Sequence, residues 1–172
     1  MARLLIVRHA IAQDRVEAHE QQRADAERPL TDKGRRRMQQ AAAGIRLETG
    51  QLQRILTSPL LRAQQTAEIL AGEFPGAEYA TTDTLSPGEP RASLLDELAA
   101  LPEKDTVAVV GHEPDLGILV AVLLCGTPQA AIQMKKGGAA LLDFPSHIAA
   151  GEGTLLWLLT PGQLRAVGSA KR

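Results

Sequence analysis

Aromatic residues and cysteines are scarce in this chain. Only 2% of its 172 residues are aromatic, so leucine, alanine, valine and isoleucine must fill any interior. The one cysteine, Cys125, excludes a disulfide framework within the chain, and its apolar neighbours predict a buried thiol. The formal net charge is −1, which excludes a broad basic field for nucleic acid or an anionic membrane.

Long apolar runs are absent as well. The most apolar later stretch, residues 116–124, is too short to span a bilayer. The apolar run before Arg8 is too short for a signal peptide. We therefore expect a soluble cytoplasmic protein without a nucleic-acid or membrane partner. No long apolar surface stripe is left over, so we also expect a monomer.

What the chain does have is an ordinary globular balance, with 44% apolar and 23% charged residues. Its length fits one domain that covers residues 1–172. Residues 11–28 are polar and lack a clean apolar period, which predicts a mobile polar loop, partly helical, whose role the sequence does not reveal.

Strand and helix patterns alternate along the rest of the chain. We predict strands at 4–7, 53–57, 77–81, 106–110, 138–144 and 154–160, and helices at 31–48, 59–74, 93–101 and 115–124. This alternation predicts an α/β fold, a three-layer sandwich with a mostly parallel central sheet and helices on both faces. The last two strands follow one another across a glycine-rich turn, so they should form an antiparallel edge.

Polar residues stand where three predicted strands end. The stretch "LLIVRHA" runs from a buried strand straight into Arg8 and His9, while Ser58 and Arg62 follow the second strand and His112 follows "TVAVVG". In an open parallel sheet these junctions share the carboxyl edge, where ligands bind. Two arginines and two histidines brought together would repel one another unless an anion occupied the site. Phosphate fits, because the guanidinium fork matches phosphate oxygens and helix N-termini add donors.

Other chemistries find less support in the sequence. His9 and His112 lack a clustered carboxylate or a close second ligand, so we expect no metal, and no nucleotide motif follows any predicted strand. We expect no cofactor either. Ser58 has two interpretations: it contacts phosphate, or it caps the helix that Pro59 begins. His19 and His147 stand in polar loops, and we assign them no function.

Four blocks of this chain resemble the histidine phosphatase superfamily, which has a phosphoglycerate mutase-like fold. These blocks are "LLIVRHA", "RPLTDKGRRRM", "ILTSPLLRAQQTAEIL" and "VAVVGHEPDLGILV", and they are most similar to those of the small SixA-type phosphohistidine phosphatases. The resemblance implies that His9 is the nucleophile and forms a covalent phosphohistidine. It also implies that Arg8, Arg62 and His112 hold the phosphate. Ala10 departs from the usual Arg-His-Gly signature, a change that the small subgroup tolerates.

The leaving group decides which hydrolase this is. A phosphomonoester needs a general acid, for which Glu113 and Glu89 are the candidates. Phosphohistidine demands less acid catalysis, because imidazole is a better leaving group than an alkoxide. We therefore expect a metal-independent phosphatase that acts on phosphohistidine of a protein. The resemblance implies a component of a histidine-kinase relay and a role in signal transduction.

Two alternatives remain. One is a small-molecule phosphomonoesterase of the same superfamily, which would use the same pocket. The other is a phosphate- or phosphopeptide-binding module without turnover.

Overall fold

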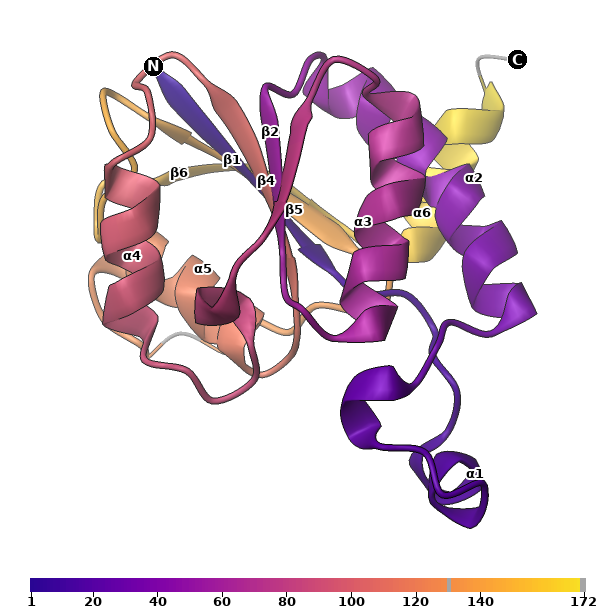
Figure 1. Ribbon diagram of the computed structural model, residues 1–172. Coiled ribbons are helices and arrows are strands. Elements are labelled where there is room, and N and C mark those ends of the chain that lie inside the picture. Colours follow the sequence, from indigo (N-terminus) through magenta and orange to yellow (C-terminus); the bar gives the residue numbers. More distant parts are fainter. Residues whose placement is uncertain (130, 171–172) are drawn as a thin grey trace.

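The computed structural model describes residues 1–129 and 131–170, in which helices cover both faces of one six-stranded sheet (Figure 1). The strands lie in the order β3-β2-β4-β1-β5-β6. Their bounds are β1 Ala2–Arg8, β2 Arg54–Thr57, β3 Glu78–Thr81, β4 Thr106–Gly111, β5 Ala139–Phe144 and β6 Thr154–Leu159. The first four pair in parallel, whereas β5 and β6 add an antiparallel edge, so the predicted architecture is confirmed.

The helices form two layers, one on each side of the sheet. Their bounds are α1 Arg15–Glu20, α2 Asp32–Thr49, α3 Leu61–Glu73, α4 Arg91–Ala99, α5 Asp115–Cys125 and α6 Pro161–Ala170. Helices α2, α3 and α6 cover one face, and α4 and α5 cover the other (Figure 1). Strand β1 is buried on both sides, because Leu5 and Val7 enter the first core while Leu4 and Ile6 enter the second. The unbroken apolar run at its start follows from this double burial.

Register brings the ends of the central strands together. Arg8 pairs with Gly111, and Thr57 pairs with Val110, so β1, β4 and β2 finish at one edge of the sheet. The residues that follow these strands must therefore be neighbours.

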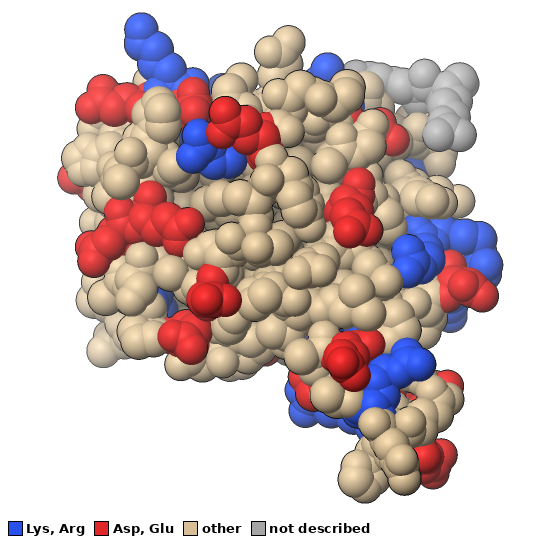
Figure 2. All heavy atoms as spheres, viewed as in Figure 1, with Lys and Arg blue, Asp and Glu red and all other residues tan. Residues whose placement is uncertain are grey.

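The segment 11–28 is partly helical and projects from the body of the molecule (Figure 1). Asp14 caps α1 by accepting a hydrogen bond from the Val16 amide at 2.8 Å. A short 3₁₀ helix, η1 (Asp25–Glu27), follows it. Figure 2 shows acidic and basic side chains crowded together on this projection.

Three local predictions were wrong or incomplete. Helix α3 begins at Leu61 rather than at Pro59, and Ser58 does not cap it. Cys125 is exposed rather than buried, because it ends α5 where the chain turns away from the sheet at Gly126. Helix α6 was not predicted, although its start carries a capping signal. Thr160 and Gln163 exchange reciprocal hydrogen bonds there, at 2.9 and 3.3 Å.

Among residues 1–129 and 131–170, no helix combines the length and apolar character that a membrane crossing requires.

Candidate active site

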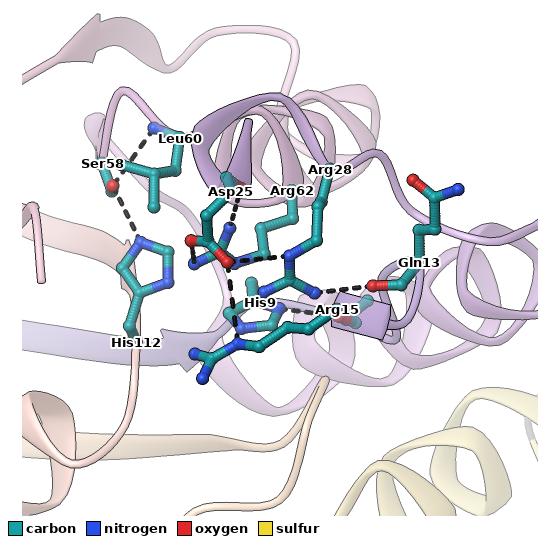
Figure 3. A network of polar contacts seen from close by, with 10 residues as sticks. His9, Gln13, Arg15, Asp25, Arg28, Ser58, Leu60, Arg62 and His112 are labelled. Carbon is teal, nitrogen blue, oxygen red and sulfur yellow. Dashed lines mark hydrogen bonds and ion pairs between the residues drawn. The ribbon is translucent and has the colours of Figure 1, made fainter. Parts of the chain in front are cut away.

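Four of the residues singled out by the sequence meet at the carboxyl edge of the sheet. The ring centroids of His9 and His112 lie 5.2 Å apart, with the rings tilted by 52°. Arg62, the second residue of α3, points its guanidinium toward them (Figure 3). Arg8, which ends β1, lies close enough for its charge to lower the pKa of both histidines. The side chains of His9, Arg62 and His112 are buried among these charges, with 7%, 3% and 4% of each residue exposed.

His9 presents one free ring nitrogen. Its Nδ1 lies 2.7 Å from the carbonyl oxygen of Ala10, which can only accept, so Nδ1 carries the proton and Nε2 keeps its lone pair. Thr66 steadies this turn by accepting the Ala10 amide proton at 3.0 Å. Burial, together with the charges of His112 and the arginines, lowers the pKa of His9 from 6.5 to about 3 despite that bond to Ala10. At neutral pH the ring is therefore neutral and nucleophilic.

His112 is held by Ser58. Its Nε2 lies 2.8 Å from the Ser58 hydroxyl, which also accepts the Leu60 amide proton at 3.3 Å (Figure 3). Burial, and after it the charge of Arg62, lowers the pKa of His112 to about 4. Ser58 thus orients an imidazole rather than capping a helix. That contact does not test whether Ser58 binds phosphate, which stays a prediction.

Donor groups are left over in the pocket. Arg8 donates from one terminal nitrogen to the Met134 carbonyl at 2.8 Å, and Arg62 donates from both terminal nitrogens to Asp25. The Nε atoms of both arginines and Nδ1 of His112 are buried without a hydrogen-bond partner among the described residues. Leaving a buried donor unsatisfied costs about 1–3 kcal/mol. The two Nε–H groups are donors, and Nδ1 of His112 is a third donor when Ser58 donates its proton to Nε2, so the arrangement suits an anion that accepts from these groups.

Two site residues were missed by the sequence interpretation. Asp25, in the polar segment 11–28, bonds Arg62 through both its backbone carbonyl and its carboxylate, at 2.8 and 3.1 Å. Arg28 donates from Nε to the other carboxylate oxygen at 2.9 Å, and only 7% of it is exposed. Burial alone would raise the pKa of Asp25, but the Arg62 and Arg28 charges hold it below its usual value. Nothing in the sequence distinguishes this pair from an ordinary solvated loop.

The candidate general acids lie in different settings. Glu113 accepts the Met134 amide proton at 3.1 Å, and burial raises the pKa of its carboxyl despite that bond and the charge of Arg8. Glu113 and Arg8 therefore bind the backbone amide and the backbone carbonyl of the same residue, Met134. Glu89 is exposed and lines a small hollow of about 30 Å³ that reaches His112. Neither contact identifies an acid catalyst, so both roles stay predictions.

Other parts of the molecule do not compete for this role. Within the described residues, no three His, Cys, Asp or Glu side chains gather closely enough to hold a metal ion. A separate cavity of about 560 Å³ lies at the opposite edge of the sheet, beside Gln53 and Asp105, which precede β2 and β4. It contains neither histidine nor any unpaired buried donor of the pocket.

Several known proteins are similar to this chain in sequence or in fold. The model of the histidine phosphatase superfamily (branch 1) matches residues 4–86. An uncharacterized protein of Picosynechococcus is 38% identical over 164 residues, 91% of this chain and 94% of that protein. Phosphohistidine phosphatase SixA of Escherichia coli is 28% identical over 146 residues, 83% and 87% of the two chains. A solved structure of the protein histidine phosphatase SixA with tungstate is 27% identical and superposes with a TM-score of 0.78, covering 94% of this chain and 99% of that one.

Proposed function

This chain belongs to the histidine phosphatase superfamily and is a SixA-type phosphatase, and from that premise we propose that its substrate is phosphohistidine on another protein. One observation carries the proposal: a neutral imidazole, whose Nε2 keeps its lone pair, lies among buried nitrogen atoms that have no hydrogen-bond partner among the described residues. An oxyanion is the ligand that best accepts hydrogen bonds from such donors.

The chemistry follows from the protonation state of His9. Its Nε2 attacks phosphorus in line, a new P–N bond forms, and the P–N bond to the substrate imidazole breaks. The leaving imidazole takes a proton from solvent as it departs. Water then attacks phosphorus, so that a P–O bond forms, the P–N bond to His9 Nε2 breaks, and phosphate leaves with the proton of the water while His9 returns to its neutral form. The bond from Nδ1 to Ala10 keeps the ring in the attacking tautomer throughout.

Stabilisation of the transferring phosphoryl group falls to the arginines. Arg8 and Arg62 place positive charge beside the equatorial oxygens, and His112 donates from Nδ1 in the tautomer whose Nε2 accepts from Ser58. These groups supply the neutralisation that a bound metal provides in other phosphoryl-transfer enzymes. The proposed reaction is therefore metal-independent.

The segment that follows α3 supports a protein as the substrate. Residues 74–105 contain β3, which pairs with β2, and α4, which buries Leu94 and Leu98 in the core. Most of this segment forms part of the sheet and of its covering layer, and its loop at Glu89 comes close to His112. We infer that the segment leaves room at the carboxyl edge for a side chain on another protein to reach His9.

Phosphate trapping tests the proposal. The wild-type protein is mixed with a protein radiolabelled on phosphohistidine, quenched rapidly and examined for label. We expect transient label that is stable in alkali and lost in acid, and none in His9→Ala. The matched control, His147→Ala, changes an exposed histidine outside the pocket and should keep both label and turnover. Label that persists in His9→Ala, or wild type that binds phosphate without turnover, would contradict the assignment.

One observation favours a second candidate, a small-molecule phosphomonoesterase. Burial raises the pKa of Glu113, which is the shift that a general acid for an alkoxide leaving group requires. Glu113→Gln discriminates between the two candidates. Under our proposal it should slow hydrolysis of a poorly activated phosphomonoester much more than hydrolysis of a phosphoramidate. An equal loss on both substrates would show that the leaving-group argument is wrong.

A further inference from the structure

Asp25 holds the Arg62 guanidinium at both of its terminal nitrogens. The Asp25 carbonyl accepts from Nη1 at 2.8 Å, and carboxylate oxygen Oδ2 accepts from Nη2 at 3.1 Å (Figure 3). Because the guanidinium is planar and rigid, fixing its two ends also fixes the direction of its Nε–H edge. That edge is buried and has no partner among the described residues. The contacts to Asp25 therefore leave the Nε–H edge of Arg62 available for hydrogen bonds to a ligand in the pocket.

The other half of the same carboxylate recruits a further arginine. Oδ1 of Asp25 accepts from Arg28 Nε at 2.9 Å, and Arg28 donates in turn to the Gln13 carbonyl at 2.6 Å. Arg28 is 7% exposed, and its charge contributes to the lowered pKa of His112. One carboxylate thus compensates two buried arginines that would otherwise repel each other across the pocket wall. A neutral side chain offers a single acceptor oxygen and no compensating charge.

Asp25 itself is not needed to fill the core. Its side chain is 52% exposed, whereas that of Arg62 is 3% exposed. The contact spans 37 positions and joins the projecting segment to α3. A carboxylate at such a place contributes little packing, so its effect must pass through the arginines that it contacts.

We propose that Asp25 is a positioning residue, which presets Arg62 for a phosphoryl group and brings Arg28 to the wall of the same pocket. This inference rests on the proposed function, because it assumes that Arg62 binds the phosphoryl oxygens. The segment 11–28 then completes the site instead of merely lying beside it. Small displacements of a positioning group cost up to about 100-fold in rate, since the reacting atoms must be aligned before transfer.

The test compares Asp25→Asn with Glu27→Gln, which removes an exposed carboxylate from the same 3₁₀ helix. We expect Asp25→Asn to lower kcat for a phosphoramidate by about 10- to 100-fold and to weaken inhibition by tungstate. Glu27→Gln should leave both unchanged, and Asp25→Glu should recover most of the loss because it restores the charge. Tighter tungstate binding by Asp25→Asn would overturn the proposal, since Asp25 would then only compete with the anion.

A double-mutant cycle identifies the route of the effect. In an Arg62→Ala background, Asp25→Asn should cause a much smaller loss of tungstate affinity, and the part that remains should pass through Arg28. An undiminished loss there would show that Asp25 does not act through Arg62. Thermal unfolding checks each variant, and Asp25→Ser replaces Asp25→Asn if the latter does not fold. If Arg62→Ala leaves turnover and tungstate binding intact, the proposed function itself fails. If Arg62→Ala abolishes them but Asp25→Asn behaves like Glu27→Gln, only the present inference fails.

Discussion

The two buried histidines should make the protein lose stability in mild acid. In the folded protein, burial lowers the pKa of His9 to about 3 and that of His112 to about 4, from the ordinary value of 6.5. Below pH 6.5 the histidines of the unfolded chain take up protons that the folded pocket does not bind, so stability falls as the pH falls toward the folded pKa values. At about pH 5 the pH is about 1.5 units below the pKa of an unfolded histidine. At 1.36 kcal/mol per unit, protonation of the unfolded chain then lowers the free energy of unfolding by about 2 kcal/mol for each ring.

This magnitude does not depend on the precise folded values, provided that both lie below 5. The two rings together should remove about 4 kcal/mol between about pH 7 and pH 5, a large share of a typical unfolding free energy of about 5–15 kcal/mol. Asp25 has a lowered pKa, so the stability that it contributes is lost only at more acidic pH. Burial raises the pKa of Glu113, so its contribution to stability increases as the pH falls. This contribution is the same in the wild type and the variants, so it cancels in the comparison between them.

Urea unfolding followed by circular dichroism at the two pH values measures the effect. His9→Gln removes one titrating ring, so its loss between about pH 7 and pH 5 should shrink to about 2 kcal/mol. His147→Gln, a substitution of an exposed histidine outside the pocket, should show the wild-type difference. If His9→Gln loses as much stability as the wild type, His9 is not held neutral by burial, and the argument for its nucleophilic state is refuted.

Two further predictions concern packing and the orientation of His112. A Cβ on Gly44 would run into the Leu164 backbone, so Gly44→Ala should cost about 2–3 kcal/mol, measured by urea unfolding. Gly72→Ala, where a Cβ meets nothing within 4 Å, should be neutral or stabilise by up to about 1 kcal/mol; equal stability of both variants would contradict the close contact of α2 and α6. Ser58→Ala removes the partner of His112 Nε2; it should lower kcat roughly 10-fold and, because it leaves a buried ring nitrogen without a partner, cost about 1–3 kcal/mol of stability at pH 7. An unchanged kcat would show that Ser58 does not orient the ring.

Local patterns in the sequence were sufficient to predict the main elements and the convergence of the site. The apolar run before Arg8 predicted a strand buried on both faces, and the alternation of strands with helices predicted a parallel sheet. Parallel strands end at a common edge, so Arg8, His9, Arg62 and His112 could be expected together before any coordinates were known. Helix α6 could also have been found, because Thr160 and Gln163 carry an ordinary capping signal.

Only the tertiary structure decided how those groups behave. The neutral state of His9 depends on how completely the fold excludes water, and its tautomer depends on a carbonyl oxygen placed at 2.7 Å. Asp25 and Arg62 lie 37 positions apart, and both types of residue are usual on a solvated surface. The periodicity of the sequence therefore could not predict that the two side chains are in contact. Periodicity records which face of an element is buried, whereas burial, tautomer and ion pairing depend on distances between segments that the chain order does not contain.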